Sequence, residues 1–249
     1  KLNPKAIIPV DLFGVPARYR LIEDIAKKYN LKVIEDAAQS FGGSIGDKKV
    51  GTFGDVASTS FYPTKPLGCY GDGGAIFTND DKLADQCRAI RIHGTSSDRY
   101  NSEVIGLNGR LDSIQGAVLL EKLEIFNDEL SMRNERNNYY RQQLNNAQYL
   151  PMNYHSAHAL FSITLGSHEK RAEMIQRLND NNIPTAVYYK YPIHLMKGFA
   201  YLGYQEGDFP ISERLSQTIV SLPMHPYLNH DDIDLIVKTL RYKTKIGLH

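Results

Sequence analysis

The sequence contains few cysteines and no long apolar run, and each shortage excludes a class of protein. Two cysteines, Cys69 and Cys87, cannot form the disulfide framework of a small secreted domain, so a reduced, cytoplasmic setting is the simpler expectation. No apolar stretch reaches the length of a membrane-spanning helix. The formal net charge of +1 gives no reason to expect a nucleic acid or an acidic membrane surface as a partner.

The histidines and glycines do not form a known metal or nucleotide motif. His155 and His158 are three residues apart, but no cluster of Cys, Asp or Glu flanks them, so we interpret them as surface histidines and expect no metal. The glycine-rich segment 71–74 is not followed by the Gly-Lys-Ser/Thr of a P-loop, and its spacing differs from the dinucleotide-binding fingerprint.

The order of strand-like and helix-like segments predicts an α/β fold. Residues 6–10 have the pattern of a short buried strand, a helix of about three turns follows, and residues 31–34 form a second strand that ends in Glu35 and Asp36. This strand–helix–strand order is typical of a parallel sheet covered by helices. Two more strands are expected over residues 56–62 and 74–78.

A long helix and a smaller domain are predicted in the second half. Asp112 and Gln115 have capping-box spacing, and a helical pattern runs from there to about residue 146. We expect residues 1–146 to form a large domain with a linking helix, and residues 147–249 a small C-terminal α+β domain. The other expected elements are a strand over 161–165, one over 183–189, and helices over 81–92, 167–182, 211–220 and 231–242.

Lys65 has an unusual context for a lysine. It lies between Pro63 and Pro66, behind an apolar run and ahead of four glycines within seven residues (68–74). Most lysines are simply solvated, and that interpretation applies to Lys65 by default. However, a lysine that is held still beside charged groups is a candidate Schiff-base former, because such surroundings lower its pKa and free the nucleophilic amine.

Three polar residues near strand ends complete a candidate site around Lys65. Ligands of open α/β sheets bind beyond the carboxyl ends of the strands, where Asp36 and Ser60 are expected, and Gln39 follows Asp36 closely. Each residue alone says little, because a strand-end Asp is more commonly a turn or helix cap. Together, an acid, a hydroxyl and a confined lysine are the groups that pyridoxal 5′-phosphate (PLP) needs.

The sequence around these residues resembles the sugar aminotransferases of the DegT/DnrJ/EryC1/StrS family. The segments that carry the resemblance are 35–40, 60–68, 71–75, 106–112 and 221–226. The resemblance covers nearly the whole chain. It implies a PLP fold-type I, aspartate-aminotransferase-like large domain and a homodimer with active sites at the interface.

The resemblance also implies roles for the residues of the candidate site. Lys65 would be the Schiff-base lysine and would carry the proton during amino transfer. Asp36 would pair with the pyridinium nitrogen of PLP, Gln39 would lie beside the ring and its phenolic oxygen, and Ser60 would bind the phosphate.

The resemblance implies contacts with the neighbouring subunit or the substrate for three further residues. Asn108 would reach the PLP phosphate in the neighbouring subunit. His194 matches a histidine that often lines the sugar-nucleotide site, and Arg110 is a weaker candidate for a substrate contact. Met196 lies where relatives often have Gln, so the substrate pocket departs from the family pattern.

The resemblance implies a function in amino transfer, from glutamate to a nucleotide-linked keto-sugar. The segments 10–14 and 106–112 are most similar to enzymes that aminate the 3-keto position of UDP-linked N-acetyl sugars or uronates, which supply surface polysaccharides and amino sugars. Lys65 argues against the dehydratase branch of the family, in which histidine replaces the lysine.

Family members carry about a hundred further N-terminal residues, with a Gly-Thr turn for the phosphate and an aromatic residue for the ring. We therefore expect the 249-residue chain alone to bind PLP poorly. The alternative hypothesis is a catalytically incomplete, non-enzymatic partner or regulatory protein with the same fold.

Overall fold

The computed structural model describes residues 3–95, 97–98, 100–144 and 153–241. The described chain separates into two compact units, one of residues 3–134 and 153–159 and the other of residues 135–144 and 160–241. The domain boundary predicted at residue 146 falls outside the described residues, so the division into 1–146 and 147–249 stays a prediction.

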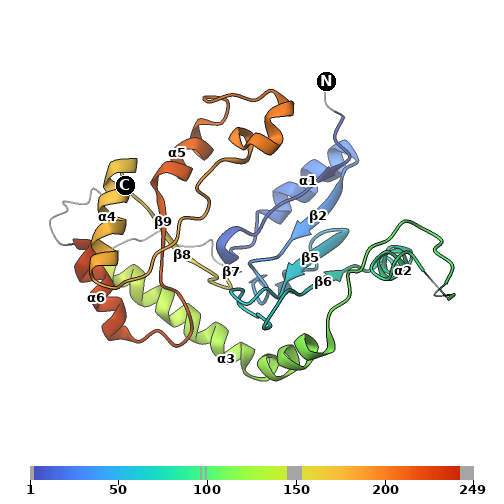
Figure 1. Ribbon diagram of the computed structural model, residues 1–249, viewed down its shortest axis with the longest axis horizontal. Helices are drawn as coiled ribbons and strands as arrows, with labels where there is room; N and C mark the ends of the chain where they lie inside the picture. Colours follow the sequence, from blue (N-terminus) through green and yellow to red (C-terminus); the bar gives the residue numbers. More distant parts are fainter. Residues whose placement is uncertain (1–2, 96, 99, 145–152, 242–249) are drawn as a thin grey trace. The chain divides into compact units, whose positions relative to one another are not determined.

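The first unit contains a four-stranded mixed sheet in the order β1-β2-β5-β6 (Figure 1). Strands β1 (Ala6–Ile7), β2 (Lys32–Asp36) and β5 (Val56–Ser60) are parallel, and β6 (Gly74–Phe77) is antiparallel to β5. Helix α1 (Tyr19–Tyr29) connects β1 to β2, which confirms the predicted strand–helix–strand unit. The chain is therefore mixed α/β.

Strand β2 shows how the buried face of this sheet is built. Val33 and Glu35 alternate inward, and Glu35 is fully buried. Its carboxylate accepts hydrogen bonds from the amides of Gly51 at 2.6 Å and Phe53 at 2.8 Å, which satisfies the charge. Burial nevertheless raises the pKa of Glu35 above its ordinary value.

The remaining elements of the first unit are short, apart from α2 and α3. A three-stranded antiparallel sheet, which the sequence pattern did not predict, consists of strands β3 (Ser44–Ile45), β4 (Lys48–Lys49) and β7 (Tyr154–His155). A 3-10 turn, η1 (Leu12–Gly14), follows β1. Helix α2 (Asp81–Ile90) begins where Asp80 accepts the Leu83 amide at 3.1 Å.

Helix α3 (Ser113–Leu144) begins in the first unit and ends in the second. The predicted capping box is wrong in one respect. Gln115 does not bond back to the helix start, because its Oε1 atom accepts the Tyr70 amide at 2.8 Å. A contact 45 residues away in sequence thus replaces the local one.

The second unit packs helices on a two-stranded sheet. Strand β8 (Phe161–Thr164) is antiparallel to β9 (Ile219–Leu222). The helices of the second unit are α4 (His168–Asp180), α5 (Pro210–Thr218) and α6 (His230–Arg241), and its 3-10 turns are η2 (Ile193–Leu195) and η3 (Lys197–Leu202). Buried Tyr140, Leu178, Val220, Ile233 and Leu240 belong to one apolar core.

Two sequence predictions in this unit were wrong. The strand expected over residues 183–189 is reduced to one isolated bridge between Ala186 and Ser221. The helix expected over 211–220 ends at Thr218, because Ile219 and Val220 pair with β8 instead. Within the described residues, no helix combines the length and the apolar character that crossing a membrane requires.

Candidate functional site

Asp36 and Ser60 end two neighbouring parallel strands of the first unit. Asp36 lies opposite Ser58 in the register of β2 and β5, and Ser60 follows two residues later. Because parallel strands present their carboxyl ends at the same edge, both side chains leave the sheet there. Asp36 is half-buried, and its Oδ1 atom accepts the Ala38 amide at 3.1 Å.

Gln39 is bonded to the chain that follows β1. Its Oε1 atom accepts the amide of Phe13 at 2.6 Å. Phe13 has a left-handed backbone with φ of 60°, which is unusual for a non-glycine residue, so this bond stabilises the η1 turn. The structure therefore gives Gln39 a bond to Phe13, and its predicted position beside a cofactor ring stays a prediction.

Asp11 is a buried acid next to this site that the sequence analysis missed. It is fully buried, and its carboxylate accepts the Tyr19 hydroxyl at 2.7 Å, the Ala17 amide at 2.8 Å and the Ser40 hydroxyl at 2.7 Å. Its own amide donates to the carbonyl of Asp36 at 3.1 Å. Burial raises the pKa of Asp11 above its ordinary value, although these hydrogen bonds oppose the shift.

Asp11 therefore ties the start of η1 to the end of β2 and the turn that follows Asp36. One sequence signal could have found it: Asp11 directly follows an apolar strand-like segment, as Asp36 does. The rule that ligands and polar groups gather at strand ends applies equally to both residues.

Lys65 lies in the segment between β5 and β6, residues 61–73, which we call the Lys65 loop. The amide of Phe61 donates to Gly73 at 2.8 Å, and the amide and thiol of Cys69 both donate to the Phe61 carbonyl, at 2.8 and 3.0 Å. Gly68 permits this closure, because a Cβ atom there would lie 2.7 Å from the carbonyl oxygen of Pro63. The backbone is thus held closed, as the prolines and glycines predict.

The amine of Lys65 is unengaged in the part of the chain that the structure describes. Lys65 is half-buried, its amide donates to the Tyr62 carbonyl at 2.9 Å, and its Nζ atom has no hydrogen-bond or ion-pair partner among the described residues. Ser60, five residues earlier, accepts the Tyr62 amide at 3.2 Å through its hydroxyl oxygen. That hydroxyl can still donate its proton.

Asn108 and Arg110 lie together ahead of α3. Both are exposed, and Nε of Arg110 donates to Oδ1 of Asn108 at 3.0 Å. A β-bridge between Asn108 and Ile92 fixes the backbone. The two predicted residues therefore form one exposed polar pair in the first unit.

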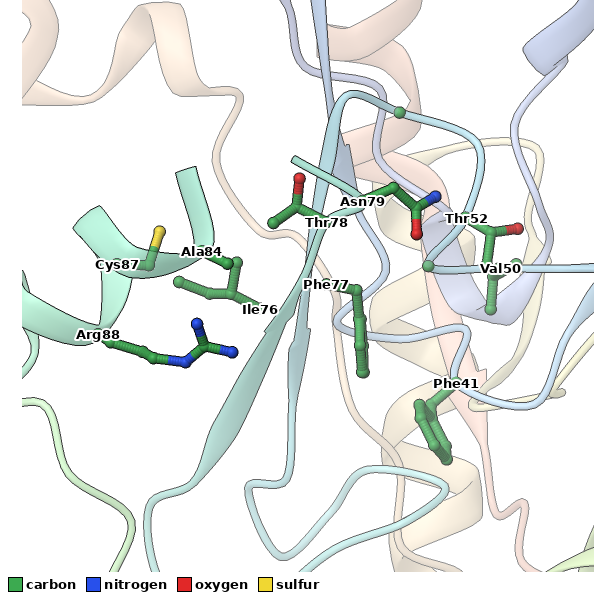
Figure 2. A pocket seen from close by; sticks show the side chains of 12 residues that line it. Phe41, Val50, Thr52, Ile76, Phe77, Thr78, Asn79, Ala84, Cys87 and Arg88 are labelled. Carbon is green, nitrogen blue, oxygen red and sulfur yellow. The ribbon is translucent and has the colours of Figure 1, made fainter. Parts of the chain in front are cut away.

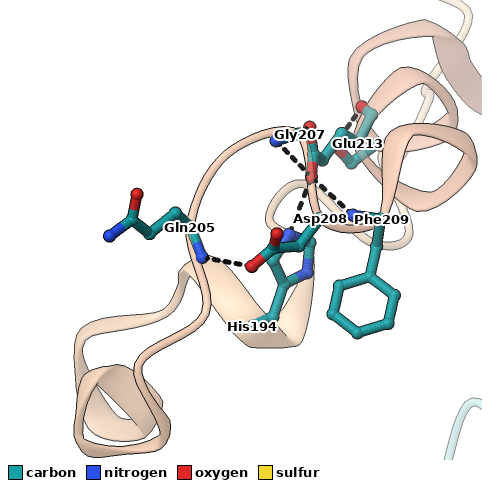
Figure 3. Close-up of polar contacts among 7 residues, drawn as sticks. His194, Gln205, Gly207, Asp208, Phe209 and Glu213 are labelled. Carbon is teal, nitrogen blue, oxygen red and sulfur yellow. Dashed lines mark hydrogen bonds and ion pairs between the residues drawn. The ribbon is translucent and has the colours of Figure 1, made fainter.

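His194 belongs to the second unit and is held by Glu213 (Figure 3). Its Nε2 atom lies 2.9 Å from Oε1 of Glu213, and the two side chains are only 8% and 12% exposed. Glu213 also accepts the amides of Gly207, at 2.9 and 3.0 Å, and Phe209, at 3.1 Å. Hydrogen bonds hold the pKa of Glu213 below its ordinary value. The bond from the Gly207 amide has the largest effect, and those with the Phe209 amide and His194 add to it.

None of the predicted site residues lines the pocket drawn in Figure 2. This pocket of about 520 Å³ lies in the first unit, where Arg88 and Cys87 of α2 face β6. Its other lining residues are Phe41, Val50, Gly51, Thr52, Gly54, Ile76, Phe77, Thr78, Asn79 and Ala84. Among the described residues, no group of three or more His, Cys, Asp or Glu side chains is arranged to hold a metal ion.

The sequence matches the model of the DegT/DnrJ/EryC1/StrS aminotransferase family over residues 2–241. A Pseudomonas aeruginosa protein named UDP-2-acetamido-2-deoxy-3-oxo-D-glucuronate aminotransferase is 41% identical over 240 residues, which cover 95% of this chain and 65% of that protein. A Geobacillus stearothermophilus protein named pleiotropic regulatory protein is also 41% identical over 240 residues, which cover 95% of this chain and 64% of that protein.

A solved structure agrees with these matches. The crystal structure of a DegT DnrJ EryC1 StrS aminotransferase from Brucella abortus superposes with a TM-score of 0.88 at 48% identity, over 96% of this chain and 64% of that chain. The chain thus spans less than two thirds of the length of each of these proteins.

Proposed function

The chain belongs to the DegT/DnrJ/EryC1/StrS aminotransferase family, and we propose that it is a PLP-dependent aminotransferase acting on a nucleotide-linked keto-sugar. One observation carries the proposal. The Lys65 amine, unengaged within the described residues, lies on a closed loop that starts at the end of β5, beside the strand that ends in Asp36.

The residues at this sheet edge fit PLP by their chemistry. A carboxylate suits a protonated pyridine nitrogen, a hydroxyl that can donate suits a phosphate, and a primary amine without a partner suits an aldehyde. Asp36, Ser60 and Lys65 supply these three groups in the first unit. When bound, PLP supplies the electron sink that amino transfer needs.

The protein's own residues would bind, orient and move a proton. Asp36 is fixed by the Ala38 amide and, through its backbone, by Asp11, so its carboxylate keeps one orientation. Ser60 would donate to an anionic oxygen. Nζ of Lys65 would bind covalently and would accept and return a proton, because within the described residues nothing else engages it.

We propose that the substrate-facing and partner-facing residues are those that the family resemblance indicates. Asn108 would reach the active site of a second subunit in a homodimer, and its exposure supports this. Arg110 is exposed beside it and would contact the substrate. His194 would line the sugar-nucleotide site, oriented by Glu213, while Gln39 would lie beside the cofactor.

For the substrate, we propose a UDP-linked 3-keto sugar, with glutamate as the amino donor. The support for the sugar is the P. aeruginosa relative, whose name specifies a UDP-linked 3-oxo uronate. The family resemblance supports glutamate as the donor and a role in amino-sugar or polysaccharide biosynthesis, and the low cysteine content supports a cytoplasmic location.

A second candidate function is regulation without catalysis. The G. stearothermophilus relative, at the same identity, is named a regulatory protein. Such a protein would keep the fold and bind no amino donor. Lys65 favours the enzyme, because an amine that is unengaged within the described residues and lies on a closed loop suits covalent catalysis.

The two functions differ in a direct assay. The polypeptide encoded by the complete gene is incubated with PLP, glutamate and a UDP-linked 3-keto sugar. The enzyme proposal predicts equal amounts of 2-oxoglutarate and UDP-linked amino sugar, measured by mass spectrometry. If 2-oxoglutarate does not form with any 3-keto or 4-keto nucleotide sugar, the proposal is wrong and the regulatory function is favoured.

A further inference from the structure

Two side chains of α3 bond to the backbone of the Lys65 loop. Oε1 of Gln115 accepts the Tyr70 amide at 2.8 Å, and Nζ of Lys122 donates to the Gly68 carbonyl at 2.6 Å. Gln115 and Lys122 are seven residues apart, two helical turns, so they lie on the same face of α3. The half of the loop that follows Lys65 is thus fastened to one helix face.

Close packing accompanies these bonds. Leu67 and Phe61 of the loop are buried against Leu119 and Phe126 of α3 in one apolar cluster. Gly71 lets Gln115 approach, because a Cβ atom there would lie 3.1 Å from its Nε2 atom.

Lys122 also makes a second contact with the loop. Its ammonium lies 5.0 Å from the centroid of the Tyr70 ring, a cation–π contact. The same side chain therefore contacts the loop at both Gly68 and Tyr70.

The Lys65 side chain itself is held by nothing comparable. Tyr62, Pro63 and Thr64 are exposed, and no described residue bonds to the Lys65 amine. The position of the amine therefore depends on the backbone of the loop. That backbone is closed by Cys69 and attached to α3 by Gln115 and Lys122.

We propose that Gln115 and Lys122 are positioning residues, which hold the Lys65 loop on α3 so that the Lys65 amine keeps the geometry that amino transfer requires. This inference rests on the proposed function. The physical reason is that displacing a reacting group by as little as about 1 Å can strongly lower the rate of the reaction. Neither side chain is proposed to contact the substrate or the cofactor.

The test compares Gln115→Leu with Gln115→Glu in the complete gene product. Leucine removes the acceptor for the Tyr70 amide, whereas a glutamate oxygen can restore it. The matched control is Gln142→Leu, which changes an exposed glutamine of the same helix. For Lys122→Met, which keeps the apolar stem, the control is Lys27→Met on the exposed face of α1.

Three quantities are measured for each variant: the hydrogen-exchange rate of the Tyr70 amide, kcat, and KM for the amino donor. We expect Gln115→Leu and Lys122→Met to speed exchange and to lower kcat by about tenfold, the effect of one lost hydrogen bond, with KM unchanged. Gln115→Glu is expected to return the exchange rate and kcat toward the wild-type values, and the two controls are expected to leave them unchanged.

The inference is overturned if exchange speeds up while kcat stays at the wild-type value, because the contacts then support the fold alone. It is also overturned if the Tyr70 amide exchanges at the wild-type rate in Gln115→Leu. If the wild-type protein transfers no amino group, the proposed function fails separately. The acylation rate of Lys65 by acetic anhydride, relative to Lys27, then replaces kcat: an unchanged ratio in Gln115→Leu contradicts the inference, and an altered ratio supports it.

Discussion

Asp36 lies directly opposite Ser58 in the parallel pair of β2 and β5. This register brings Asp36 and Ser60 out of the sheet at the same edge, two residues apart in level. The Lys65 loop starts immediately after Ser60. Asp36, Ser60 and the loop that carries Lys65 therefore meet at the same edge of the sheet. The proposed cofactor site follows from that register rather than from a pocket.

Asp36→Asn tests the proposed partner of the pyridine nitrogen. Asparagine keeps the size of the side chain but cannot balance a positive charge, so we expect the rate of amino transfer to fall by about 100-fold. Steady-state kinetics with glutamate measures this change. Asp24→Asn, at an exposed position of α1, is the control and should leave the rate unchanged. A normal rate in Asp36→Asn would remove Asp36 from the site.

Ser40→Ala tests the buried network below the site. The Asp11 carboxylate is fully buried and loses one of its three donors in this variant. We expect the free energy of unfolding to fall by about 1.5–3 kcal/mol, the range for a hydrogen bond to a charged group. Urea unfolding measures it. Ser97→Ala, at an exposed position, should change the value by less than about 0.5 kcal/mol; equal effects of the two variants would contradict the account.

Glu213 predicts a pH dependence in the second unit. Its pKa is lowered in the folded protein, so the stabilisation is present above its ordinary value of 4.5 and is lost as the pH falls through the lowered folded value. We expect the Gly207 and Phe209 amides to exchange faster on acidification through that range, after correction for intrinsic rates. In Glu213→Gln they should already exchange faster at neutral pH.

The control for this prediction is Glu206→Gln, which changes an exposed carboxylate in the same segment. It should leave both amides protected at neutral pH. Protection that is equal in Glu213→Gln and the wild type would show that the carboxylate does not hold this segment.

Mixed dimers test the proposed role of Asn108. Lys65→Ala and Asn108→Ala chains, each inactive alone, are unfolded together and refolded. If Asn108 serves the neighbouring site, one site of each mixed dimer is intact and random pairing restores about a quarter of the wild-type activity. If Asn108 acts within its own subunit, the mixture stays inactive.

The sequence predicted those parts of the fold and site that depend on local pattern. The strand that ends at Asp36 was predicted because its apolar residues stop there, and the closure of the Lys65 loop follows from its prolines and glycines. The strand predicted over residues 56–62 ends at Ser60 instead, because Phe61 turns into the Lys65 loop and bonds to Gly73 and Cys69. The roles of these residues were predicted by family resemblance and stay proposals.

Contacts between distant segments could not be predicted in this way. Gln115 has the spacing of a helix cap, yet its acceptor is used by Tyr70, which no local pattern indicates. Ile219 and Val220 continue a helical pattern but pair with β8, because a strand partner outweighs helix propensity. Asp11 is satisfied by Tyr19 and Ser40, a network visible only after folding.

The central claim is that the Lys65 amine binds PLP. The most direct measurement is borohydride reduction of the complete gene product after incubation with PLP, followed by peptide mass spectrometry. The account predicts one equivalent of phosphopyridoxyl group on Lys65, and its loss when glutamate is added before the reduction. Modification spread over exposed lysines such as Lys27, with none enriched at Lys65, would contradict it.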